Sequence, residues 1–281
     1  MRSIRKKITK IRRIIESYLL NITLDKALAK TAKETNATLD DLILRTCIGV
    51  DYDLEILPHY LDNLKQHGVS HYRFLLHTKH GKDSPEIREA TRLIDDLSLD
   101  TKVVVWTEQH WTTQKYKRRL DELISDLAPD RWILTVEADE FPEFPVSLKA
   151  TFSHMKARGY DILTGKFWDR VAPDGKLHPL QADKPVWEQC PVGRKPSFDG
   201  GCMDKVIIHK AGQSLVPGNH YTSPLGDQYK LRPFPRTIKV HHFKWFDNFH
   251  YKISGQEDRD IYFKEQCKHH RENISKNFGM S

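Results

Sequence analysis

The chain has 281 residues, of which 38% are hydrophobic and 30% charged, and it carries a formal net charge of +7. This composition fits a soluble globular protein that buries a core of its own. The positive charge is local, because residues 1–40 hold ten Lys or Arg and four Asp or Glu, whereas residues 41–281 hold 35 and 34. A nucleic-acid-binding domain would spread basic charge over its folded body, so the charge argues against nucleic acid as a partner.

Residues 1–20 have the pattern of a basic amphipathic helix. Ile4, Ile8, Ile11 and Ile15 recur at helical spacing among several Lys and Arg residues. Such a helix can lie on an anionic membrane surface, or it can pack on the body of the protein or on a partner. No apolar run is long enough for a membrane span, and no secretory cleavage site follows the basic start. Four widely spread cysteines without a Cys-x-x-Cys pair indicate reduced thiols, so we expect a cytoplasmic protein, and the helix over residues 1–20 could contact the inner membrane face.

Strand-like and helix-like segments alternate from residue 42 onward, which predicts an α/β fold with a mainly parallel sheet flanked by helices. Expected strands are Leu42–Val50, Tyr72–His77, Lys102–Trp106 and Trp132–Val136. Expected helices are Leu54–His67, a helix that opens at Ser84-Pro85-Glu86, and Thr112–Leu127.

The regularity fades after Pro145, which predicts an irregular mixed second half. Further expected strands are Tyr160–Trp168, Lys205–His209 and Thr237–Phe243, before a charged helix over residues 256–276. We therefore expect an N-terminal helical extension, a single α/β domain and a C-terminal helix. Their boundaries are 1–40, 41–248 (a nucleotide-binding half, 41–145, and an irregular second half, 146–248) and 249–281.

Carboxylates follow the fourth expected strand directly. Glu137, Asp139 and Glu140 stand where that apolar strand would emerge at the carboxyl edge of the sheet, which is where ligands of open α/β sheets bind. Glu137 and Asp139 are spaced to turn toward one Mn²⁺ or Mg²⁺ ion. Glu140 should face away if the strand continues. The alternative is a solvated acidic turn, with Pro142 and Pro145 ending the strand.

Three histidines are candidates for the remaining positions around such an ion. His220 closes a loop rich in Pro and Gly, and His241 and His242 follow a strand-like run. Imidazole is an acceptable ligand for manganese beside carboxylates. On a strand His241 and His242 face opposite sides, so at most one of them can point into a given site. Lys244 is either a phosphate-neutralising residue or an ordinary surface lysine.

Six segments in this order resemble the family 2-like glycosyltransferases of GT-A fold, in the branch whose metal motif reads Asp-x-Asp-Glu-Phe. They are Leu57–Val69, Val136–Phe141, Phe167–Gly175, Lys205–His209, Gly218–His220 and His241–Trp245. The chain departs from the family pattern in two places. Glu137 stands for the first Asp of the metal motif, and Asp51-Tyr52-Asp53 stands for the usual Asn-Glu after the first strand.

The resemblance implies transfer of a sugar from a nucleoside diphosphate sugar to an acceptor hydroxyl, with inversion of the anomeric centre. Glu137 and Asp139, with His220 or His242, would hold the metal and the diphosphate. Asp51 or Asp53 would bind base or ribose, unless they belong to a surface turn.

An inverting enzyme also needs a carboxylate base. Asp169, Glu188 and Asp199 are the candidates, and Glu188 is preferred, although Trp187 and Glu188 can equally begin a short helix. The resemblance makes 146–248 the acceptor half, and the acceptor is expected to be a carbohydrate or lipid-linked. A metal-dependent phosphohydrolase or nucleotidyltransferase, and a non-catalytic glycan- or partner-binding protein, are the alternative functions.

Overall fold

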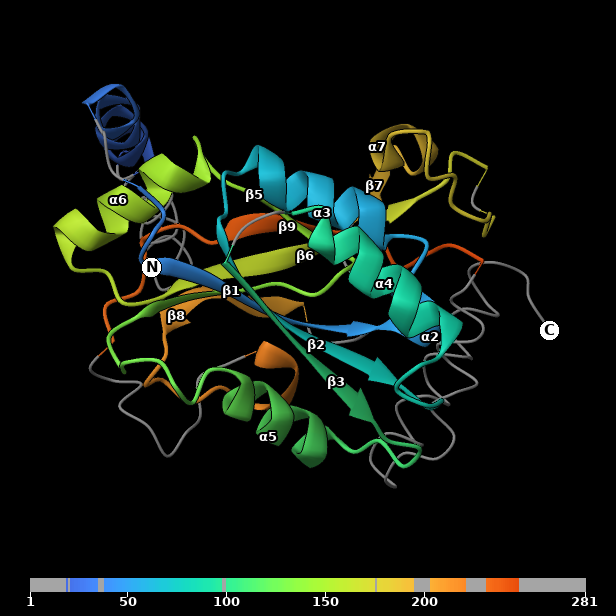
Figure 1. Ribbon diagram of the computed structural model, residues 1–281. Helices are drawn as coiled ribbons and strands as arrows, with labels where there is room; N and C mark the ends of the chain where they lie inside the picture. The colour runs from blue at the N-terminus through green and yellow to red at the C-terminus, as the bar shows by residue number, and fades with distance from the viewer. Residues whose placement is uncertain are drawn as a thin grey trace, which may run out of the picture.

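The computed structural model describes residues 19, 21–34, 38–97, 100–174, 176–194, 203–220 and 231–247. Within these residues the strands form one nine-stranded sheet in the order β3-β2-β1-β4-β8-β6-β9-β5, with β7 paired to β6 (Figure 1). The strands are β1 Leu42–Gly49, β2 His71–Thr78, β3 Asp100–Thr107, β4 Trp132–Thr135, β5 Glu140–Glu143, β6 Leu163–Val171, β7 Val192–Arg194, β8 Asp204–Lys210 and β9 Ile238–His242.

The sheet is parallel in its first half and mixed in its second half. β3, β2, β1 and β4 run side by side in one direction. β8 is antiparallel to β4 and to β6, so β6 and its parallel neighbour β9 run in the same direction as β1. β5 and β7 pair antiparallel with β9 and β6. The predicted α/β class, with its mainly parallel sheet and mixed second half, is confirmed.

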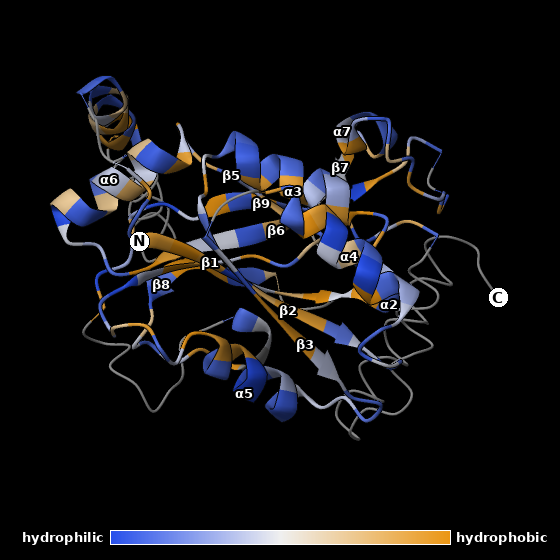
Figure 2. Ribbon diagram, in the orientation of Figure 1, coloured by the Kyte–Doolittle hydropathy of each residue, from blue (hydrophilic) through white to orange (hydrophobic). Residues whose placement is uncertain are grey.

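Helices cover both faces of the sheet. They are α2 Val50–Asp53, α3 Leu57–Gln66, α4 Pro85–Asp95, α5 Thr113–Leu123, α6 Leu148–Arg158, α7 Val186–Gln189 and the 3₁₀ turn η1 Pro217–Asn219. In Figure 1 α3, α4 and α6 lie on one face, and α5 lies on the other. Figure 2 shows apolar strands between helices whose outer sides are polar. This arrangement follows from strands with few polar positions, which must be covered on both sides.

Local sequence signals explain where these helices begin and end. The side chains of Ser84, Thr112 and Ser147 cap α4, α5 and α6 by accepting a hydrogen bond from a first-turn N–H. Gly159 ends α6 in the left-handed region with a φ of 65°. The sequence analysis missed α6, although Ser147 and Gly159 mark both of its ends.

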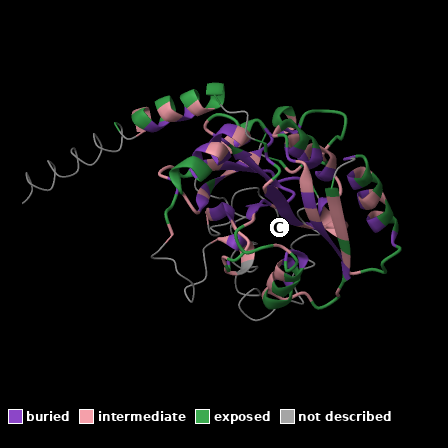
Figure 3. Ribbon diagram, turned by 60° about the vertical axis from the view of Figure 1, so that its left-hand side comes forward, coloured by how far each residue is buried: buried purple, intermediate pink, exposed green. Residues whose placement is uncertain are grey.

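The helical segment at residues 21–34 packs against the body, although most of its outer side is exposed (Figure 3). Leu24 and Leu28 are buried, and Asp25 pairs with Arg236 at 2.7 Å. The amphipathic helix predicted over residues 1–20 lies outside the described residues except for Leu19, as does the whole terminal helix predicted over residues 256–276. No helix in the described part of the chain is long and apolar enough to cross a membrane.

Candidate functional site

The site lies at the point of the sheet where the order of the strands along the chain reverses. From β1 the chain continues to β2 on one side of the sheet and later to β4 on the other, so the carboxyl ends of β1 and β4 are neighbours at a topological switch point. Ligands of open α/β sheets bind in the crevice at such a point. Asp51 and Asp53 follow β1, and Glu137 and Asp139 follow β4.

A turn after β4 gathers three carboxylates. The N–H of Glu140 donates to the carbonyl of Glu137 at 3.0 Å, which closes the turn. One ligand atom from each of Glu137, Asp139 and Glu140 lies within 4.8 Å of the others. The expectation that Glu140 faces away from Asp139 is therefore wrong, because the strand does not continue and the turn removes the alternation of sides. The expectation that Pro142 ends the strand is also wrong. Pro142 lies inside the edge strand β5, where its missing N–H is tolerated.

A buried lysine neutralises part of this cluster. The Nζ of Lys205, on β8, lies 2.9 Å from Glu137 Oε1 and 2.7 Å from Glu140 Oε1, and the side chain is 1% exposed. Burial opposes its charge, but the carboxylates of Glu137 and Glu140 outweigh burial and raise the pKa of Lys205. Burial raises the pKa of Glu140 to about 7 against the attraction of Lys205, and the nearby carboxylates of Glu137 and Asp139 add to the rise. The sequence analysis placed Lys205 only in a strand, and a lysine at a strand start gives no signal of burial.

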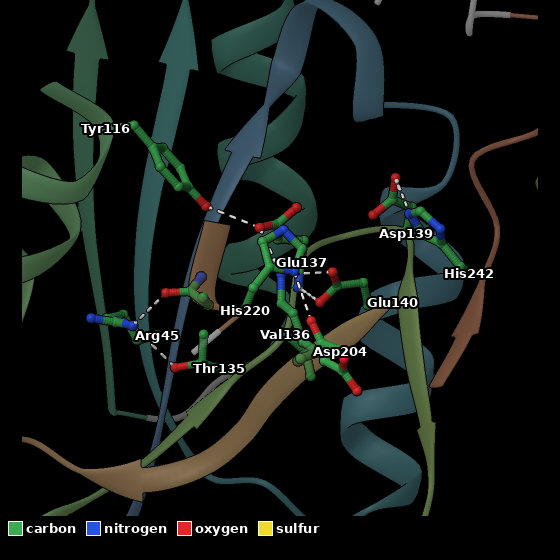
Figure 4. A network of polar contacts seen from close by, with 12 residues as sticks. Arg45, Tyr116, Thr135, Val136, Glu137, Asp139, Glu140, Asp204, His220 and His242 are labelled. Carbon is green, nitrogen blue, oxygen red and sulfur yellow. Dashed lines mark hydrogen bonds and ion pairs between the residues drawn. The ribbon is translucent and has the colours of Figure 1, made fainter. Parts of the chain in front are cut away.

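Two further contacts fix the turn. The hydroxyl of Tyr116, on α5, donates to Glu137 Oε1 at 3.2 Å. The N–H of Glu137 donates to Glu140 Oε2 at 2.9 Å. Glu140 thus binds Lys205 with one oxygen and the backbone of the turn with the other. These contacts give Glu140 a structural task, and they hold Glu137 beside Asp139 (Figure 4).

His242 lies between two buried aspartates. Its Nε2 is 3.6 Å from Asp139 Oδ2, and its Nδ1 donates to Asp169 Oδ1 at 3.1 Å. The ring stacks on Phe167 with centroids 4.5 Å apart. Burial opposes protonation, but Asp139 and Asp169 together raise the pKa of His242 to about 9. The structure therefore brings the predicted residues Asp139, Asp169 and His242 into one polar group.

His220 follows a strained turn and lies near Lys205. Its Nδ1 donates to the carbonyl of Asp204 at 2.7 Å, and burial lowers its pKa. The turn before it contains two left-handed residues, Gly218 with a φ of 80° and Asn219 with a φ of 57°. The buried side chain of Arg45 donates to Asn219 Oδ1 at 3.0 Å, which anchors the turn to β1. Figure 4 shows His220 close to Glu137 and His242 on the far side of Asp139.

Asp51 and Asp53 are engaged with the backbone around β1 and β2. Asp51 accepts hydrogen bonds from Thr78 Oγ1 at 2.7 Å and from the N–H of Lys79 at 2.9 Å. Asp53 Oδ2 accepts from the N–H of Gly49 at 3.0 Å. Asp51 therefore links the segment after β1 to the end of β2, and Asp53 links α2 to the end of β1, at the edge where a nucleotide is expected.

Lys244, Glu188 and Asp199 are the remaining predicted site residues. Lys244 follows β9, and its Nζ lies 5.0 Å from the centre of the Trp245 ring. Glu188 is exposed on α7, the short helix that the sequence analysis gave as the alternative. Its carboxylate has no hydrogen-bond or ion-pair partner among the described residues. Asp199 lies outside the described residues. His241 pairs with Glu143 instead of the acidic cluster, which confirms that adjacent strand residues serve opposite faces.

The donor set suits a hard divalent cation. Carboxylate oxygens from Glu137 and Asp139 and the Nε2 atoms of His220 and His242 are ligands that Mn²⁺ accepts, and Mg²⁺ accepts the oxygens. The described residues of the cluster offer no cysteine, which argues against a thiolate-dependent metal.

No family model and no curated protein matches this chain. Among solved structures, one of S. aureus TarS matches at 10% identity with a TM-score of 0.40, over 85% of this chain and 44% of that one. S. aureus TarS 1–349 in complex with UDP matches at 10% identity with a TM-score of 0.40, over 85% and 72%. UDP-glucose pyrophosphorylase complexed with UDP-glucose matches at 10% identity with a TM-score of 0.27, over 47% and 57%. This chain thus spans less than half of the first of these TarS chains.

Proposed function

We propose that the protein is a metal-dependent glycosyltransferase of the GT-A type, which moves a sugar from a nucleoside diphosphate sugar to an acceptor hydroxyl and inverts the anomeric centre. The observation that carries the proposal is the meeting of Glu137, Asp139 and His242 at the switch point of the sheet. A nucleotide bound at the end of β1 would bring its diphosphate toward these acids. Since both are negative, a cation has to lie between them.

Asp139 would bind the ion directly. Glu137 and Nε2 of His242 or His220 would be the other protein ligands. A bound Mn²⁺ or Mg²⁺ supplies positive charge for the diphosphate as it leaves. Lys244 would add charge for the phosphates from the end of β9. Asp51 and Asp53 would meet base or ribose at the end of β1.

Lys205 favours a glycosyltransferase over a two-metal phosphohydrolase or nucleotidyltransferase. Two-metal sites need carboxylates that bridge ions about 3.5–4 Å apart. Here the Lys205 ammonium lies between Glu137 and Glu140, 2.9 Å and 2.7 Å from their oxygens. It takes the position that a second ion would need, so the cluster formed by the described residues favours one divalent ion.

Glu188 is the proposed base. It is exposed and without a side-chain partner in the described structure, whereas Asp169 is fully buried and bonded to His242. Glu188 would take the hydroxyl proton as the acceptor oxygen bonds to the anomeric carbon and the bond from that carbon to the diphosphate oxygen breaks. We place this reaction in the cytoplasm, in the synthesis of a polysaccharide or another glycan on a carbohydrate or lipid-linked acceptor.

A thermal-shift screen of UDP-, GDP-, dTDP- and CMP-sugars, with Mn²⁺ or with a chelator, tests the proposal. One nucleoside diphosphate sugar at about 100 times its Kd should stabilise the folded chain by roughly 2.7 kcal/mol, and only with metal present. Asp139→Asn should abolish this shift while the melting temperature in chelator stays close to wild type. The absence of any metal-dependent shift in the wild type would support the non-catalytic alternative.

Product analysis separates the enzyme classes. The wild type with donor and acceptor should release a nucleoside diphosphate and a glycosylated acceptor, whereas a phosphohydrolase would release a sugar phosphate without needing an acceptor. Glu188→Gln should keep the metal-dependent donor shift and lose transfer. Normal turnover in that variant would move the base elsewhere.

A further inference from the structure

We infer that Asp169 is a positioning residue for the metal site, which orients His242 so that its Nε2 faces a cation held by Asp139. This inference rests on the proposed metal site and assigns a residue that acts through another. Asp169 is then not the catalytic base, because a fully buried carboxylate that accepts a hydrogen bond from an imidazole cannot reach an acceptor hydroxyl.

The sheet register places the pair. β6 and β9 are parallel, and Asp169 on β6 is the register partner of His242 on β9. Neighbouring side chains on one face of a sheet are within contact distance. Asp169 Oδ1 therefore meets His242 Nδ1 at 3.1 Å, and Asp169 is 0% exposed.

The contact fixes which imidazole nitrogen can bind a metal. An ionised carboxylate only accepts hydrogen bonds, so Nδ1 of His242 carries a hydrogen, and Nε2 is the nitrogen that a cation can bind by displacing its proton. Stacking on Phe167 restricts rotation of the ring. A carboxylate behind a ligating histidine also raises the basicity of that ligand.

The position of Nε2 agrees with this role. It lies 3.6 Å from Asp139 Oδ2. Two adjacent ligands of an octahedral ion at about 2.1 Å are roughly 3 Å apart. A small side-chain movement brings the two atoms to that separation, whereas Nδ1 is turned to the opposite side.

The chain contains a matched control on the other face of β9. His241 Nε2 lies 2.9 Å from Glu143 Oε2, so the preceding residue has the same type of carboxylate partner. Glu143 pairs also with Lys239 and is more than half exposed, at the sheet edge and outside the acidic cluster. Removing this carboxylate should therefore leave metal binding unchanged.

Mn²⁺ binding followed by electron paramagnetic resonance, without nucleotide, tests the inference in the full chain. Asp169→Asn, which keeps the shape of the side chain, should weaken Mn²⁺ binding about 10- to 100-fold. Glu143→Gln should bind Mn²⁺ as the wild type does. In a His242→Gln background, Asp169→Asn should cause no further loss, because its effect passes through His242.

The outcomes are distinguishable. Unchanged affinity in Asp169→Asn, or an equal loss in the presence and absence of His242, overturns the role of Asp169 and leaves the proposed function in place. A wild-type chain that binds no Mn²⁺ contradicts the metal site and this role together. Nitrogen NMR of His242 in the wild type with Zn²⁺, which is diamagnetic and accepts imidazole, needs no variant. Nδ1 should stay protonated while the Nε2 signal shifts, and a shift at Nδ1 instead would refute the assignment.

Discussion

Replacing Lys205 by Met tests whether the acidic cluster depends on its internal cation. Methionine keeps the unbranched length and removes the ammonium that lies 2.9 Å from Glu137 and 2.7 Å from Glu140. Glu140 is 1% exposed, so its carboxylate would be left buried without its cation. Breaking a buried ion pair by removing one partner costs about 3–5 kcal/mol of unfolding free energy. For a chain of this size, 1 kcal/mol corresponds to about 2–4 °C in melting temperature.

The loss should depend on pH in a defined direction. The pKa of Glu140 is already raised to about 7, chiefly by burial, and without Lys205 it should rise further. A carboxyl whose folded pKa lies above its unfolded value loses stability as pH rises through that interval. Lys205→Met should therefore be closest to wild type near pH 5 and furthest from it near pH 8.5.

Urea unfolding in a chelating buffer measures both effects without interference from metal. The double variant Lys205→Met, Glu140→Gln should recover most of the loss at pH 8.5, because it removes both charges and keeps an oxygen for the N–H of Glu137. The reasoning is refuted if Lys205→Met lies within about 1 kcal/mol of wild type at pH 8.5, or if the double variant is no more stable than the single one.

Two other predictions concern stability. Burial lowers the pKa of His209 to about 3, and Arg45 adds to this. Because the unfolded histidine takes up a proton first, His209 should cost the folded state about 1.4 kcal/mol between pH 7.5 and pH 5.5. The difference in urea unfolding free energy between the wild type and His209→Gln should therefore change by that amount between the two pH values. Gly165→Ala places a methyl group 2.4 Å from Val240 Cγ2 and should cost about 1–3 kcal/mol. Gly81→Ala, which meets no atom within 4 Å in the described structure, should stay within about 0.5 kcal/mol, and equal melting temperatures for the two variants would contradict the packing argument.

The first half of the fold was predictable because its signals are local. Each strand from β1 to β4 is a short apolar run, and Ser84 and Thr112 are N-cap residues that mark the starts of α4 and α5 between them. Parallel strands joined by helices admit few arrangements. The carboxyl ends of β1 and β4 had to meet at one edge, so the position of Glu137 and Asp139 followed from chain order.

The second half depends on contacts between segments far apart in sequence. β8 inserts antiparallel between β4 and β6, and nothing in Lys205–His209 specifies that neighbour. Arg45 was a signal that could have been used, because a charged residue within the apolar run of β1 requires a buried partner. That partner, Asn219, belongs to the turn before His220.

The site divides its carboxylates between two tasks, and the division explains why a motif of three acids can serve one ion. Glu140 is committed to Lys205 and to the backbone N–H of Glu137, so it shapes the turn. Asp169 is committed to His242, so it orients a ligand. Both buried acids thus act on their neighbours, and the proposed cation would bind Asp139 and Glu137, the second of which also contacts Lys205 and Tyr116 through Oε1. Burial and register therefore assign the roles that residue type alone leaves open, since all four side chains carry the same functional group.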